Sequence, residues 1–277
     1  MTPTIVLVHG AWHGSWCWER VAGLLAAQGL QIRTVDLPST GGPDIATIGS
    51  AAAARPGTGA GAMEPPSAGA LQPPGLAEDA AAVRAALADL GPVILCGHSY
   101  GGMVISAAGH LPQVRRLVYL CAFMPEAGES VESILAADRR AGYWMRRRGP
   151  WTVPDPARAP AVFYGDCEAA VQAWAGARLR PQSTRAFGES LEEPAWKHQP
   201  STYVVCARDG VIQPAIQRGR LAPRAGEVVE LDSAHAPFLS RPVEVAALLE
   251  HLARAGAPRR PAAGGTSAII TGPGQSG

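Results

Sequence analysis

The hexapeptide GHSYGG at residues 97–102 is the stretch whose residue types and spacing point most directly to chemistry. It follows the apolar run PVILC and is followed by the apolar run MVISAAG. An ordinary strand-to-helix turn would also use glycine and serine, because both tolerate tight backbone geometry. Between a strand and a helix, however, the G-x-S-x-G spacing presents the serine oxygen as a nucleophile. We therefore expect Ser99 to attack a carbonyl carbon, provided that the chain supplies a base and an acid.

A serine hydroxyl is a weak nucleophile near neutral pH and needs a base within hydrogen-bond reach. Among the seven histidines, His235 is the strongest candidate. It lies in DSAHAPF, directly after the last predicted strand, where a loop can aim a side chain back at the serine. The alternative is a purely structural histidine. The sequence predicts His235 as the general base.

The acid of such a triad follows the serine and precedes the histidine in the chain. Asp209, in CARDGVIQP, meets this order and follows the penultimate predicted strand. Asp232 and Asp166 are rivals, but Asp232 is only three residues from His235 and Asp166 lies in a different region of the chain. We predict that Asp209 holds the imidazole tautomer and stabilises the imidazolium without taking the proton.

An oxyanion formed during the attack needs hydrogen-bond donors. The backbone amide of Tyr100, at the start of the predicted helix, is one candidate donor. The amide of Ala11, in HGAWHG after the first predicted strand, is the other. His9 and His13 in the same loop are interpreted as backbone-bracing or pocket residues rather than catalytic ones.

Three residues are predicted to contact substrate: Trp12, Met124 and Trp144. Trp12 lies beside the predicted oxyanion donor. Plain packing is an equally good interpretation of Trp12 and of its neighbour Trp16. No metal or cofactor is expected, because the five cysteines form no C-x-x-C pair and provide no zinc-ligand spacing.

The elements that must position these residues alternate along the chain. Continuous apolar runs typical of buried parallel strands occur at 4–8, 31–37, 92–96, 115–123, 201–207 and 226–232. Helical patterns occur at 18–29, 77–91, 102–110, 214–221 and 243–256. Strands that alternate with helices predict a doubly wound α/β fold with a mostly parallel sheet.

Residues 1–123 and 201–256 are expected to form this core. Residues 124–200 are too long for a simple crossover and are predicted to form an inserted helical cap over the carboxyl ends of the strands. The Gly/Ala/Pro-rich stretch 39–75 is expected to be a flexible loop, and residues 257–277 a disordered tail.

Composition narrows the classes of partner. A formal net charge of +1 and 17% charged residues argue against a nucleic-acid partner, so the arginines at 146–148 are interpreted as a solvated face. The amino terminus lacks a charged signal-peptide region, and no apolar run reaches the length of a membrane span. We expect a cytoplasmic protein that binds a small-molecule ester, does not bind membranes and has an oligomeric state that the sequence does not specify.

The motifs HGAWHGSWCW, GHSYGGMVI, ARLRPQS, YVVCARD and LDSAHAPFLSRP together resemble the bacterial esterase branch of the α/β-hydrolase superfamily. That branch is similar to plant methyl-ester hydrolases of the salicylate-binding type and to hydroxynitrile lyases. The resemblance covers nearly all of residues 4–254. It implies the α/β-hydrolase fold, the triad Ser99, Asp209 and His235, and the amides of Ala11 and Tyr100 as oxyanion donors.

The expected function is a serine carboxylic-ester hydrolase acting through an acyl-enzyme on small to medium apolar esters. Hydroxynitrile lyases of this group carry a lysine after the histidine and a threonine in the first loop, where this chain has Ala236 and Ala11. These differences argue against a lyase, so a lyase-like or tailoring acid/base catalyst is the first alternative and not the leading interpretation. A non-catalytic small-molecule binder is the second, although a binder does not need a complete triad.

Overall fold

The structure is a computed structural model, and it describes residues 1–41, 72–136, 138 and 142–255. Most of the predicted loop 39–75 and the predicted tail 257–277 lie outside the described residues. Among the residues that the structure describes, no helix combines the length and apolarity that a membrane span requires.

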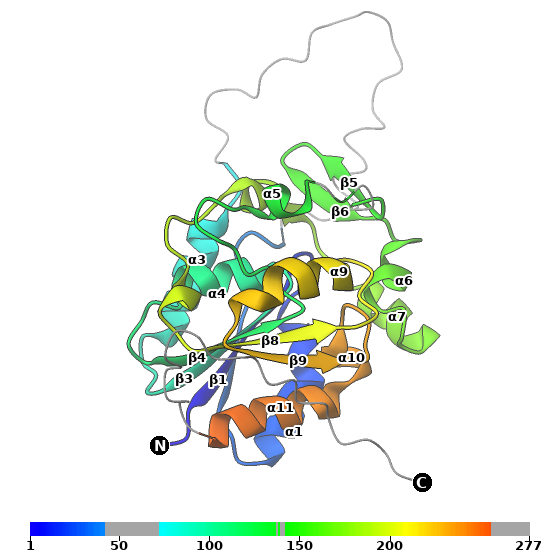
Figure 1. Cartoon of the computed structure of the whole chain (residues 1–277). Helices are drawn as coiled ribbons and strands as arrows, with labels where there is room; N and C mark the ends of the chain where they lie inside the picture. Colours follow the sequence, from blue (N-terminus) through cyan, green and yellow to red (C-terminus); the bar gives the residue numbers. More distant parts are fainter. Residues whose placement is uncertain (42–71, 137, 139–141, 256–277) are drawn as a thin grey trace, which may run out of the picture.

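A six-stranded sheet forms the centre of the molecule (Figure 1). Its strands run in the order β2-β1-β3-β4-β8-β9, and every neighbouring pair is parallel. β1, β3 and β8 are buried along their whole length, as expected for strands covered on both faces. The bounds are β1 Thr4–Val8, β2 Ile32–Val35, β3 Val93–His98, β4 Val114–Leu120, β8 Ser201–Cys206 and β9 Glu227–Leu231.

Helices cover both faces of this sheet. α1 (Glu19–Ala27) and α11 (Pro242–Arg254) pack together on one face, and α3 (Leu76–Leu87) packs against α4 (Gly101–Ala108) on the other (Figure 1). α9 (Pro214–Ile216) lies on the same side as α4 and continues into a π-helical turn, Gln217–Leu221. The predicted α/β-hydrolase architecture is confirmed.

The inserted segment, defined here as residues 124–200, contains more than the predicted helical pieces. Its strands β5, β6 and β7 form a small antiparallel sheet. The sequence pattern does not predict this sheet, because β5 reads Met-Arg-Arg-Arg and has no apolar alternation. The bounds are α5 Val131–Leu135, β5 Met145–Arg148, β6 Trp151–Pro154, α6 Ala159–Phe163, α7 Ala169–Gly176, β7 Gln182–Ser183 and α8 Arg185–Gly188.

Short turns complete the described chain. They are the 3-10 turns Ser15–Trp18, Ala195–Lys197 and Ala222–Arg224 and the one-turn helix α10, Pro237–Ser240.

The strand order reverses between β1 and β3, because β2 lies on one side of β1 and β3 on the other. Val8 at the end of β1 is directly opposite Gly97 near the end of β3. The loops that leave these two strands therefore start side by side at the carboxyl edge of the sheet, which is where ligands bind in doubly wound folds.

Candidate active site

The turn from β3 into α4 holds Ser99 in a strained conformation. The φ angle of Ser99 is +52°, in the left-handed region that residues with a Cβ rarely adopt. Flanking glycines make the turn possible: a Cβ atom on Gly97 would lie 2.5 Å from the carbonyl oxygen of Gly101. A Cβ atom on Gly101 would lie 2.8 Å from the carbonyl oxygens of Val8 and His9. This tight turn places the serine hydroxyl at the carboxyl edge of the sheet.

The structure brings Ser99, His235 and Asp209 together although they are far apart in sequence. The Nε2 atom of His235 lies 3.0 Å from the Oγ of Ser99, and its Nδ1 lies 2.7 Å from an oxygen of Asp209. A carboxylate only accepts hydrogen bonds, so Nδ1 carries the proton and Nε2 is free to accept the serine proton. All three residues are buried. This arrangement can generate a serine nucleophile.

The carboxylate of Asp209 is fully satisfied. One of its oxygens accepts from the amides of Val211 and Ile212, at 2.7 and 3.0 Å. The other accepts from His235 and, at 2.8 Å, from the side-chain amide of Gln217. No sequence motif points to Gln217, which is placed by the π-helical turn that follows α9. These donors fix the carboxylate in the orientation that the histidine requires.

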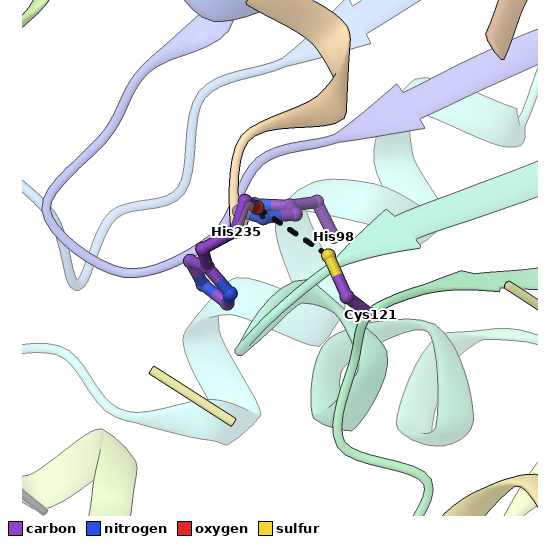
Figure 2. Close-up of side chains that lie close together, drawn as sticks. All are labelled: His98, Cys121 and His235. Atoms are coloured by element: carbon purple, nitrogen blue, oxygen red, sulfur yellow. Dashed lines mark hydrogen bonds between the residues drawn. The ribbon is translucent and has the colours of Figure 1, made fainter. Parts of the chain in front are cut away.

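The main chain of His235 is anchored separately from its ring (Figure 2). Its carbonyl oxygen accepts from Nε2 of His98, at 2.8 Å, and from the thiol of Cys121, at 3.4 Å. The imidazole of His235 packs beside that of His98, with ring centroids 4.7 Å apart, but its two nitrogens face Asp209 and Ser99. One ring nitrogen of each histidine and the sulfur of Cys121 lie within 4.8 Å of one another. Both ring nitrogens of His235 are engaged elsewhere, so the geometry fits a hydrogen-bonded anchor better than a metal site.

The two predicted oxyanion donors lie in the wall of one cavity together with Ser99. Among the residues that the structure describes, neither the amide of Ala11 nor that of Tyr100 has a hydrogen-bond acceptor. The ring of His9 donates to the carbonyl of Gly10, at 2.8 Å. Because a trans peptide points its N–H opposite to its carbonyl, this bond orients the amide of Ala11.

Both histidines of the first loop brace the backbone. Burial lowers the pKa of His9 to about 4 and that of His13 to about 3. His13 donates to the carbonyl of Ala11 at 2.8 Å and accepts from the hydroxyl of Tyr164 at 2.9 Å. A neutral imidazole can do both, so these rings are structural donors and acceptors.

The cavity above Ser99 has a volume of about 420 Å³ and is walled mainly by apolar side chains. The inserted segment supplies most of the wall, from α5, β5, β6 and α8. Among the described residues of this wall, the charged ones are Glu132 and Arg147, and both are exposed. Its apolar lining residues include Trp12, Phe123, Val131, Leu135, Trp144, Met145, Phe187 and Val211.

Two of the three predicted substrate contacts lie in the cavity wall. Trp12 and Trp144 pack edge to face there, with ring centroids 4.8 Å apart. Met124 is not in the wall: its side chain is buried in the core, and the preceding Phe123 lines the cavity instead. The amide of Phe123 donates to the carbonyl of Ser99, at 3.0 Å, and this bond holds Phe123 beside the nucleophile. The prediction for Met124 is therefore wrong as to position.

A parallel sheet with a strained serine at its carboxyl edge, beside a buried histidine, is the arrangement of the α/β-hydrolase class. The chain belongs to the alpha/beta hydrolase family, whose sequence profile matches residues 5–248.

Named relatives agree with that class. The chain is 36% identical over 132 residues to the carbendazim hydrolyzing esterase of Nocardioides sp., covering 47% of this chain and 46% of that protein. It is 27% identical to methylesterase 7 of Arabidopsis thaliana, covering 90% of this chain and 95% of the relative. The crystal structure of a pyrethroid hydrolase from Sphingobium faniae superposes with a TM-score of 0.69 at 25% identity, covering 92% of this chain and 98% of that one. The protein is a hydrolase of the carboxylesterase type.

Proposed function

We propose that this protein is a serine carboxylic-ester hydrolase that uses Ser99 as nucleophile, His235 as general base and Asp209 as the orienting acid. The observation that carries the proposal is the position of one imidazole, 3.0 Å from the serine oxygen and 2.7 Å from the carboxylate. A bridging histidine of this kind activates a serine for acyl transfer.

In the first half-reaction, Oγ of Ser99 attacks the ester carbonyl carbon while its proton moves to Nε2 of His235. The carbonyl oxygen becomes an oxyanion and accepts hydrogen bonds from the amides of Ala11 and Tyr100. When the tetrahedral intermediate collapses, His235 returns the proton to the leaving alkoxide. The alcohol departs and the acyl group stays on Ser99.

In the second half-reaction, His235 takes a proton from water as the water oxygen attacks the acyl-enzyme. Collapse of this intermediate breaks the bond to Oγ, returns the proton to Ser99 and releases the carboxylic acid. Asp209 stays ionised throughout and stabilises the imidazolium that forms twice in each cycle.

For the substrate, we propose small to medium, largely apolar esters. Aromatic and aliphatic side chains form most of a cavity of about 420 Å³. Such a lining gains affinity by removing apolar substrate surface from water. Relatives named as methylesterases and as a pyrethroid hydrolase support an ester that carries an apolar group.

Hydrolysis of p-nitrophenyl acetate, butyrate and octanoate by the wild type and by Ser99→Ala tests the proposal. We expect kcat/KM to fall about 10⁶-fold in the variant. Ser106→Ala is the matched control, since Ser106 is a buried serine in α4, the helix that follows Ser99. Its hydroxyl bonds to Gly102 and Tyr119. Full activity of Ser99→Ala would contradict the mechanism. Cyanohydrin cleavage without ester hydrolysis would favour the lyase-like alternative.

A further inference from the structure

A chain of buried hydrogen bonds runs beneath the cavity and is not used by the triad. The side-chain amide of Gln182 donates to the hydroxyl of Ser39, at 2.7 Å, and that hydroxyl donates to Asp79, at 2.5 Å. The hydroxyl of Tyr100 donates to the same oxygen of Asp79, at 2.7 Å. All four residues are completely buried. The chain links β7 of the inserted segment to the turn that holds the nucleophile.

At the other end, the chain reaches the first loop. The side-chain oxygen of Gln182 accepts from the hydroxyl of Thr40, at 2.6 Å, and from the amide of Trp12, at 3.4 Å. Each side-chain donor and acceptor along this path therefore has a partner. The amides of Tyr100 and Ala11 are the two predicted oxyanion donors. The path therefore connects Tyr100 to Trp12, the residue next to Ala11.

Trp12 needs such support because its backbone is strained. Its φ angle is +62°, a left-handed conformation that is unusual for a bulky side chain. Such a conformation persists where the surroundings fix it. The carbonyl of Trp12 accepts from the amide of Arg180, at 2.8 Å, and its indole donates to Thr152, at 3.0 Å. All the polar groups of Trp12 are thus held by residues outside its own loop.

We propose that Asp79, Ser39 and Gln182 are positioning residues that couple the two amides of the oxyanion hole. Breaking the hydrogen-bond chain at either end should therefore weaken transition-state binding by both amides. The inference rests on the proposed esterase function. A merely structural chain would stabilise the fold without changing the ratio of transition-state to substrate binding.

Tyr100→Phe tests one end of the chain, since it removes one hydroxyl and leaves the amide. Esterase kcat and KM and the Kd of phenylboronic acid, which forms a tetrahedral adduct with a serine oxygen, are measured alongside thermal unfolding. We expect kcat to fall about tenfold with KM within about twofold, and Kd to rise about tenfold. Tyr119→Phe is the matched control, because Tyr119 is also buried and bonds to Ser106 at 2.8 Å. It should lose stability while keeping kcat and Kd within about twofold.

Gln182→Met tests the other end, and the double variant tests the coupling. The side chains of Gln182 and Tyr100 share no hydrogen bond, so independent structural effects would multiply. We expect the double variant to lose less kcat than the product of the two single losses, because the first substitution already breaks the chain.

Unchanged kcat and boronate affinity in folded Tyr100→Phe and Gln182→Met would overturn the inference, as would multiplicative losses in the double variant. If Tyr100→Phe does not fold, Ser39→Ala replaces it in the same comparison. Failure of the coupling would leave the dependence on Ser99 intact, whereas failure of the proposed function would show as activity that survives Ser99→Ala.

Discussion

The carboxyl edge of the parallel sheet and the inserted segment meet at one cavity but contribute to it differently. The sheet edge supplies Ser99, Asp209 and His235, each held by backbone and side-chain hydrogen bonds. The inserted segment supplies most of the cavity wall and none of these three side chains. The difference indicates that the sheet edge supplies the proposed reacting groups and that the wall residues of the inserted segment select the ester. Substitutions of the triad and of these wall residues should therefore change different kinetic constants, whereas Gln182, which bonds to the first loop, is expected to affect kcat.

After Ser99 itself, the largest effect is expected at the sheet edge, from Asp209→Asn. The amide cannot hold the protonated Nδ1 of His235 in the same tautomer, so kcat should fall about ten-thousandfold with little change in KM. Asp232→Asn is the matched control, because the carboxylate of Asp232 is 76% exposed and pairs with Arg208 instead. Steady-state kinetics on both variants decide the assignment, and an equal loss in the two would contradict it.

A smaller effect is expected when the elbow itself is displaced by Gly97→Ala. The added methyl would meet the carbonyl oxygen of Gly101 at 2.5 Å, so the turn must shift. A displacement of about 1 Å at a nucleophile typically costs about a hundredfold in rate. Gly91→Ala, in open space just before the same strand, should retain activity and melting temperature. Wild-type kcat in Gly97→Ala would show that the close approach is not needed.

In the inserted segment, Trp144→Ala should change substrate choice rather than chemistry. Removal of this ring enlarges the cavity and weakens binding of an apolar acyl group, so KM for p-nitrophenyl butyrate should rise about tenfold. The value of kcat should fall far less than in Asp209→Asn. Trp174→Ala is the control, because Trp174 packs against Trp16 outside this cavity. A selective loss of kcat in Trp144→Ala would break the proposed division between the regions.

The last effect concerns stability and should leave activity at pH 7 unchanged. Since burial lowers the pKa of His13 to about 3, the folded protein does not bind a proton there at pH 5, whereas the unfolded chain does. Stability therefore falls as the pH drops below about 6.5, by about 2 kcal/mol at pH 5 for one such histidine. Urea unfolding at pH 7 and pH 5 should show a smaller difference in His13→Gln than in the wild type. Exposed His251 provides the control, His251→Gln, which should leave the difference unchanged.

Local patterns in the sequence were sufficient for the sheet edge. Buried strands read as continuous apolar runs, and the G-x-S-x-G spacing constrains the backbone around Ser99 directly. The order of Ser99, Asp209 and His235 along the chain then indicates which acid and which base serve this serine. The structure brings these three together where the strand ends predict that they should lie.

Other features depend on contacts that no local pattern encodes. Gln217 reaches Asp209 because of a π-helical turn, and Gln182 reaches Ser39 through a strand of only two residues. Phe123 lines the cavity in the place predicted for Met124, and its amide donates to the carbonyl of Ser99. The three arginines of β5 pair with β6, and a run of arginines has no alternation from which this pairing could be predicted. Tertiary pairing decides each of these positions, so sequence periodicity could not predict them.

Mass spectrometry of the protein after reaction with a fluorophosphonate tests the central claim most directly. We expect one adduct, on the peptide that contains Ser99. The adduct should be absent from Ser99→Ala and should form far more slowly in Asp209→Asn. A wild-type protein that stays unmodified, or an adduct on a different residue, would contradict the assignment of Ser99 as a nucleophile activated by His235.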